Sequence, residues 1–331
     1  MLIAKNVLIL PLCLALAPWS FAQSALKTVD INTRQLPAGN VSMPAWSNGM
    51  LIQWTQVQGT DKPNIWAFDS TGALAVPATE VWFPGTSSAA IHAATVTPSH
   101  LIVASVLAWS SSGQMSTLLC YVSPAGVVKV SQIPAQFDPE HLAYSPDGVL
   151  WAFGRRAATS QSDVKTTYRT IQRFGPDGTW LSGSVLSTEL NPPGQPTANP
   201  AWSSVNGESF LLVGATRKFL FSSPARRFVE MDNEGRTLRN VALNFPPEEQ
   251  DRGNGRPSTL THSAISPSGR IYVSFNAGQR VYILNPDSLT WTTVDPSSYD
   301  SQYRGVYGSD GESLVMRTFN DRFGWFALTA Q

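Results

Sequence analysis

The chain has 331 residues, of which 14% are charged, and its 23 Lys and Arg residues balance its 23 Asp and Glu residues. A neutral chain exerts no long-range attraction on nucleic acid or anionic lipid, so we expect no nucleic-acid partner. The length alone is compatible with two domains, but a repeat that runs through the sequence favours a single all-β domain.

The first 22 residues have the pattern of a secretory signal peptide. Lys5 precedes an apolar run over residues 7–17, and Ala22 ends a small-x-small sequence before Gln23. We predict cleavage after Ala22, which leaves residues 23–331 as one domain in the periplasm or outside the cell. The apolar run is too short to cross a bilayer, so we predict no transmembrane segment. Cys120 is then the one remaining cysteine, and no internal disulfide is expected.

Six copies of one strand pattern follow one another along the chain. Each copy begins with a short strand, a turn and a longer strand, and continues through a variable loop to a third strand, a polar turn and a fourth strand. Alternation of apolar and polar residues between turn residues predicts β-strands, and no stretch shows sustained helical periodicity. The copies are expected over residues 44–76, 92–130, 141–185, 201–241, 262–292 and 304–328.

The third copy contains the clearest hairpin. Glu140–Phe153 consists of an alternating run, a Ser-Pro-Asp-Gly turn and a second alternating run, and His262–Phe275 repeats this order in the fifth copy. The sixth copy ends after its third strand, whereas Leu26–Asn32 resembles a fourth strand without the three that should precede it. We therefore predict a six-bladed β-propeller with four-stranded antiparallel blades, in which the N-terminal strand completes the last blade.

The hairpin Pro139–Ala152 and the later segment Gln172–Gly178 resemble the NHL-type and related six-bladed propeller repeats, over nearly all of the mature chain. The repeats are degenerate, because His141, His262 or Arg304 stands where such repeats often have Gly near the start of the first strand. The resemblance implies the fold. It implies no single activity, since propellers include lyases, hydrolases, receptors and scaffolds.

Three of the four histidines share one position when the copies are aligned by sequence. Each stands seven residues before the last residue of the first hairpin turn, taken as Ser99, Gly148 or Gly269; they are His92, His141 and His262. First strands line the channel of a propeller, so these imidazoles would surround one mouth. Three imidazoles can bind Zn²⁺ and leave a position open for water or substrate, with Glu140 as candidate general base. A solvated polar lining without metal is the alternative.

Basic residues are expected in loops at the same mouth. The loops between the second and third strands of copies three and four hold Arg155, Arg156, Arg217 and Arg227, and Arg304 occupies the histidine position of the sixth copy. Guanidinium groups bind carboxylate, phosphate or sulfate. These arginines therefore predict a small anionic ligand or an acidic protein surface, with solvated loop charges as the alternative.

The sequence favours an exported, monomeric propeller that binds a ligand or a protein at this channel mouth. A metal-dependent lyase or hydrolase with the three-histidine zinc site is the second hypothesis. No phosphate-binding Gly-rich loop, Gly-x-Ser-x-Gly, HExxH or CxxC motif occurs, so no other cofactor is indicated.

Overall fold

The computed structural model describes most of the strand-forming residues of the chain. The described residues are 27–30, 41–42, 44–55, 62–133, 137–156, 168–186, 209–222, 226–250, 260–275, 280–294, 303–318 and 322–326. The predicted signal peptide and the segment 201–207, which we expected to open the fourth blade, lie outside them.

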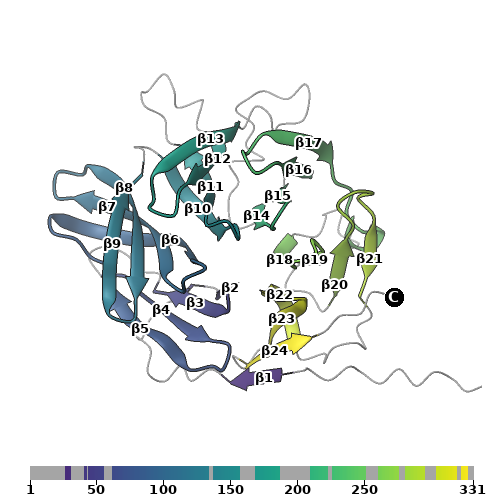
Figure 1. Cartoon of the computed structure of the whole chain (residues 1–331), viewed down its shortest axis with the longest axis horizontal. Helices are drawn as coiled ribbons and strands as arrows, with labels where there is room; N and C mark the ends of the chain where they lie inside the picture. The colour runs from purple at the N-terminus through teal and green to yellow at the C-terminus, as the bar shows by residue number, and fades with distance from the viewer. Residues whose placement is uncertain are drawn as a thin grey trace, which may run out of the picture.

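Six four-stranded antiparallel sheets are arranged around a central channel (Figure 1). The prediction of an all-β, six-bladed propeller is confirmed. Blades 1 to 3 consist of β2 (Ala45–Ser47), β3 (Met50–Trp54), β4 (Asn64–Asp69) and β5 (Leu74–Glu80); β6 (Thr86–Val96), β7 (Ile102–Ser110), β8 (Met115–Ser123) and β9 (Gly126–Gln132); and β10 (Phe137–Tyr144), β11 (Leu150–Arg156), β12 (Tyr168–Phe174) and β13 (Trp180–Leu186).

Blades 4 to 6 follow in the same order. They consist of β14 (Ser209–Val213), β15 (Lys218–Ser222), β16 (Arg227–Met231) and β17 (Thr237–Ala242); β18 (Leu260–Ile265), β19 (Ile271–Phe275), β20 (Val281–Leu284) and β21 (Trp291–Thr293); and β22 (Tyr303–Asp310), β23 (Ser313–Thr318) and β24 (Arg322–Phe326), with β1 (Lys27–Asp30) as the fourth strand. β1 pairs antiparallel with β24, with Lys27 opposite Trp325.

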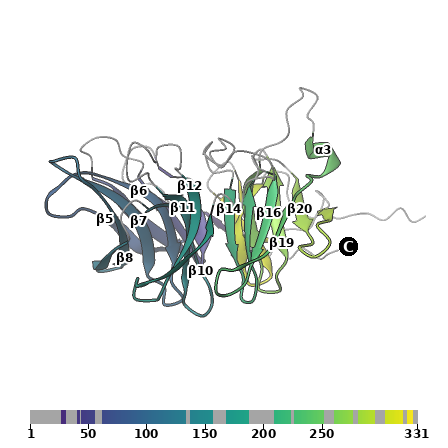
Figure 2. The ribbon, with the colours of Figure 1, turned by 90° about the horizontal axis from the view of Figure 1, so that it is seen from above.

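The first strand of each blade is the innermost one, and the inner strands β2, β6, β10, β14, β18 and β22 contact one another around the ring. The blades pack face to face through buried side chains, because alternate residues of a strand point to its two faces and both faces are covered. Fully buried aromatic rings include those of Trp66, Trp151 and Phe174. Figure 2 shows the ring edge-on, with the short helix α3 (Pro247–Gln250) projecting from one face. No helix of the described residues is long and apolar enough to span a membrane.

The fourth blade begins later than the sequence pattern indicated. Its first described strand is β14, and the turn that follows is Gly214–Arg217, closed by a hydrogen bond from Gly214 N to Arg217 O of 2.9 Å. Arg217 therefore lies in the first hairpin of the blade, on the opposite face from the loops between second and third strands. The predicted position of Arg217 is wrong, because the pattern at 201–207 was read as the first hairpin.

Candidate functional site

The first hairpins of blades 2 and 3 have the same turn, and their comparison corrects the alignment of the histidines. Ser145 N donates to Val149 O and Gly148 N donates to Ser145 O, both at 2.9 Å. In blade 2 the equivalent hydrogen bonds run from Thr97 N to Leu101 O (2.8 Å) and from His100 N to Thr97 O (2.9 Å). His100 has a φ of 65° and so occupies the left-handed position that Gly148 takes at 82°. His is among the non-glycine residues that are enriched in this region.

When the blades are aligned by these turns, His92 stands one residue before the strand position that His141 and His262 occupy. His141 lies opposite Phe153 and His262 lies opposite Ser274. The equivalent place in blade 2, opposite Ser105, is occupied by Ala93, and the strand register shifts between Ile91 and Ala93. His92 is the extra residue of this β-bulge, as Glu140 is in blade 3. The prediction of three equivalent histidines is wrong, whereas Arg304, opposite Arg317, is equivalent to His141 and His262.

His92 is hydrogen bonded across two blades. Its Nδ1 lies 2.8 Å from Oδ1 of Asp138, and the two side chains are 29% and 12% exposed. β6 and β10 are the inner strands of blades 2 and 3, so the pair lies in the wall of the channel. Sequence reasoning missed Asp138, because 46 residues separate it from His92 and only the blade arrangement brings them together.

His141 is enclosed by aromatic rings. Its ring centroid lies 6.1 Å from that of Phe153 in its own blade and 5.8 Å from that of Phe210 in blade 4. Burial lowers the pKa of His141 from 6.5 to about 4, because the charged imidazolium loses its hydration there. The imidazole is therefore neutral at physiological pH and packs as an aromatic side chain.

His262 lies between blades 5 and 6. Its ring centroid is 4.6 Å from that of Tyr307, and its Nδ1 is a buried atom without a hydrogen-bond partner among the described residues. Burial, and then the charge of Arg317, lower the pKa of His262 to about 4. The three histidines thus have three different surroundings. Within the described part of the chain, no group of three or more His, Cys, Asp or Glu side chains could hold a metal ion, so the predicted zinc ligands are not brought together.

The predicted arginine cluster is divided between the two faces of the ring. Arg217 Nε donates to Glu230 Oε1 at 2.6 Å, and its Nη2 lies 2.9 Å from Asp287 Oδ1. These carboxylates raise the pKa of Arg217 and neutralise its charge. Arg227 Nε donates to Asn240 Oδ1 at 2.9 Å on the other face.

The remaining predicted arginines lie in strands. Arg155 and Arg156 are the last residues of β11, opposite Asp138 and Phe137, rather than loop residues as predicted. Arg304 is in β22. The side chains of these three arginines lie outside the described part of the structure.

The first hairpins of the blades surround a cavity at their end of the channel. It has a volume of about 600 Å³ and receives residues from every blade, among them Asn48, Pro98, Ser145, Ala215, Pro267 and Asp310. We call this cavity the hairpin mouth. Among the described residues that line the hairpin mouth, Asp310 carries a formal charge, and none is a Lys or an Arg. Asp310 Oδ2 accepts a hydrogen bond of 2.9 Å from Trp325 Nε1, which fixes its carboxylate.

A second hollow of about 400 Å³ adjoins the hairpin mouth between blades 2 and 3. Pro98 and Tyr144 line both, so the two hollows are neighbours on the hairpin face. Leu101, Val128 and Pro176 give the second hollow largely apolar walls. Cavities of this size, with apolar walls and a few polar groups, accommodate small ligands.

No protein-family model and no curated protein matches the chain. Solved structures with a similar course of the chain include virginiamycin B lyase from Staphylococcus aureus, at 11% identity over 92% of this chain and 99% of that one, with a TM-score of 0.45. A luciferin-regenerating enzyme matches at 12% identity over 88% and 87%, with a TM-score of 0.49. A protein of unknown function from Bacteroides caccae matches at 14% identity over 83% of each chain, with a TM-score of 0.45. Similarities this low carry no functional argument, and the fold rests on the strand topology.

Proposed function

We propose that the protein is an exported binding propeller that holds a small ligand in the hairpin mouth. The observation that carries the proposal is the cavity of about 600 Å³ to which all six blades contribute. A site at the meeting point of six rigid sheets is preorganised, which lowers the entropy cost of binding. The signal-peptide pattern of residues 1–22 supports export to the periplasm or beyond.

The ligand that suits this cavity is neutral or cationic. Asp310 supplies a carboxylate, Asn48 and Ser145 supply polar side chains, and Pro98 and Pro267 supply apolar surface. A buried or half-buried carboxylate favours a cationic group and disfavours a second anion. The anionic ligand proposed from Arg155, Arg156, Arg227 and Arg304 would need the opposite face, and Arg217 is already paired with two carboxylates.

A three-histidine zinc enzyme receives no support from the geometry of His92, His141 and His262. His92 is paired with Asp138, and His141 and His262 are packed against aromatic rings. We therefore favour a binding protein over a zinc enzyme. The proposal includes a single exported domain over residues 23–331.

Three aromatic probes of similar size test the proposal: benzylamine, benzyl alcohol and benzoate. Saturation-transfer NMR of the mature protein should give binding in the order benzylamine, benzyl alcohol, benzoate. Ala215→Trp places a large ring in the hairpin mouth and should abolish binding. Ala125 is an exposed residue of the turn between β8 and β9, outside the cavity, so Ala125→Trp is the matched control and should bind as the wild type does.

Asp310→Asn tests the charge preference separately. Loss of one partly exposed ionic interaction of about 1 kcal/mol corresponds to benzylamine binding that is weaker by about fivefold. Benzyl alcohol binding should not change. Undiminished binding of all three probes to Ala215→Trp, or a preference for benzoate, would contradict the proposed site.

A further inference from the structure

The pair formed by His92 and Asp138 is a second polar site in the channel wall, and the proposed function does not use it. The side chain of Asp138 is 12% exposed, and its Oδ1 lies 2.8 Å from Nδ1 of His92. A carboxylate can only accept at this distance, so Nδ1 carries the hydrogen. The neutral imidazole then has its lone pair on Nε2, which makes Nε2 a hydrogen-bond acceptor.

Nε2 of His92 is open to a ligand. It makes no hydrogen bond with the described residues, and it is not among their buried unpartnered side-chain atoms. The side chain of His92 is 29% exposed. His262 is different, because its partnerless nitrogen is buried. His92 is therefore the one of the two whose bond to a carboxylate fixes the hydrogen on one ring nitrogen and leaves the other as the acceptor.

The backbone around the pair gives it a defined position. His92 is the extra residue of a β-bulge in β6, and Glu140 is the extra residue of the corresponding bulge in β10. Bulges redirect side chains and are frequent beside binding sites. Asp138 and Glu140 both belong to the inner strand β10, and Arg155 of β11 stands opposite Asp138 in the strand pairing.

We propose that His92 and Asp138 form a binding subsite for a hydroxyl group of a ligand in the channel. The hydroxyl donates its hydrogen to Nε2 of His92, and Asp138 acts as a positioning residue by holding the hydrogen on Nδ1. The ligand class is an alcohol or a polyol. This inference does not depend on the hairpin mouth, because neither His92 nor Asp138 lines that cavity.

Nitrogen-detected NMR of the imidazoles is the direct test on the wild-type protein. We expect Nε2 of His92 to be unprotonated and Nδ1 to carry the hydrogen. Titration with ethylene glycol should shift the Nε2 resonance of His92, whereas 1,2-dimethoxyethane, which has no O–H group, should not. Protonated Nε2, or equal shifts with the diol and the ether, would overturn the proposal.

Carbethoxylation by diethyl pyrocarbonate measures the free lone pair in variants. Nε2 attacks a carbonyl carbon, the bond to the bridging oxygen breaks, the Nδ1 proton is released, and the leaving ethyl carbonate decomposes to ethanol and CO₂. In Asp138→Asn the amide can donate to Nδ1 and reverse the tautomer, so the rate at His92 should fall by about tenfold or more. Asp147→Asn, in an exposed turn, is the matched control and should leave the rate unchanged.

His100 is the internal standard in the same mass-spectrometric experiment, because it is exposed and belongs to a different turn. An unchanged rate at His100 shows that Asp138→Asn retains the fold of blade 2. An unreactive His92 beside a fully modified His100 in the wild type would reject an accessible Nε2. Equal His92 rates in the wild type and Asp138→Asn would reject the role of Asp138.

Discussion

Two junctions between neighbouring blades have the same backbone arrangement but different side chains. They are the junction between blades 1 and 2 and the junction between blades 3 and 4. The first is an apolar cluster, in which Ile52 and Val76 of blade 1 pack with Ile91 and Val106 of blade 2. The second has an apolar part, with Trp151 of blade 3 against Leu220 of blade 4, but it also encloses cations. The first junction combines this apolar burial with hydrogen bonds between uncharged groups, one between Ser47 Oγ and Thr95 Oγ1 (2.9 Å) and one from Asn48 Nδ2 to Val96 O (2.6 Å).

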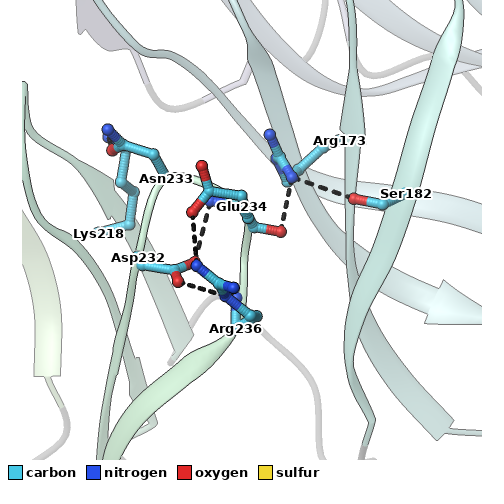
Figure 3. A network of polar contacts seen from close by, with 7 residues as sticks. All are labelled: Arg173, Ser182, Lys218, Asp232, Asn233, Glu234 and Arg236. Atoms are coloured by element: carbon cyan, nitrogen blue, oxygen red, sulfur yellow. Dashed lines mark hydrogen bonds and ion pairs between the residues drawn. The ribbon is translucent and has the colours of Figure 1, made fainter.

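The cations of the second junction form a polar network (Figure 3). Lys218 is 0% exposed; its Nζ donates to Ala215 O at 3.1 Å and to Asn233 Oδ1, and lies 5.8 Å from the centre of the Trp151 ring. Arg173 crosses from blade 3 to Glu234 O at 2.6 Å and also donates to Ser182 Oγ at 3.2 Å. Burial lowers the pKa of Lys218, since the ammonium is desolvated.

Lys218 stands where other blades have an aliphatic residue. It begins β15 opposite Val213, as Leu150 begins β11 opposite Tyr144. The first position of the second strand therefore needs a long side chain that fills the space between the blades. The ammonium of Lys218 is accepted there because two oxygen atoms and the face of an aromatic ring surround it. The polar junction therefore gains hydrogen bonds that fix its geometry and becomes sensitive to substitution and to pH.

The largest effect is expected at Trp151, the ring that both cations of the polar junction face. Trp151→Ala should lower the free energy of unfolding by about 3–5 kcal/mol, because it leaves a large cavity and removes both cation–π contacts. Urea denaturation measures the change. Trp151→Phe is the control and should cost clearly less, since the Trp151 Nε1 has no partner among the described residues. Equal costs would show that the ring is not what supports the cations.

A pair of aliphatic truncations compares the apolar parts of the two junctions. Ile52 and Leu220 are each 0% exposed. Ile52→Ala and Leu220→Ala should each lower the free energy of unfolding by about 2–4 kcal/mol through lost burial and a residual cavity. Urea denaturation at two salt concentrations should give the same loss for Ile52→Ala. A salt-dependent loss there would show that charged groups contribute to the junction between blades 1 and 2, against the expectation.

Substitution of Lys218 separates its length from its charge. Lys218→Ala should lower the free energy of unfolding by about 2–3 kcal/mol, because Asn233 Oδ1 and Ala215 O lose their donor and a cavity opens. Lys218→Met keeps the length and removes the desolvated charge, so its cost should stay below about 1 kcal/mol or reverse in sign. Thermal and urea unfolding compare the variants. A Met variant as unstable as the Ala variant would mean that the ammonium itself is required.

The smallest effect is a pH dependence of the polar junction through His141, which contacts Phe153 of blade 3 and Phe210 of blade 4. The pKa of His141 is about 4 in the folded chain, against 6.5 for an unperturbed histidine, so acidification below pH 6.5 protonates the unfolded state first. Stability should therefore fall between pH 6.5 and pH 4, by about 1–2 kcal/mol at pH 5.

His141→Phe should remove this contribution while retaining the aromatic packing, as measured by urea unfolding at neutral pH and at pH 5. His100→Asn is the control, because Asn also tolerates the left-handed turn position and His100 is exposed. An unchanged acid sensitivity in His141→Phe would show that other groups, such as His262, are responsible.

Alternation and turn residues were sufficient to predict the number and type of the blades, though not the start of the fourth, because strand formation and tight turns are local properties of the sequence. The hairpin at 140–153 is present as predicted, with Gly148 at a φ of 82°. The same reasoning failed where a turn used an unusual residue. His100 in the left-handed position displaced the alignment of blade 2 by one residue, and a shift of one residue changes which side chains are equivalent.

The sequence by itself determined the all-β class and the six repeated blades, because a period of two residues and a repeated turn are visible without any knowledge of neighbours. Only the tertiary structure decided which side chains meet. The bulge at His92, its bond to Asp138 46 residues away, and the enclosure of Lys218 against Trp151 depend on strand register and on the packing of one blade against the next. Contacts between blades join segments that no local pattern relates, and so the candidate sites could be located only after the ring was assembled.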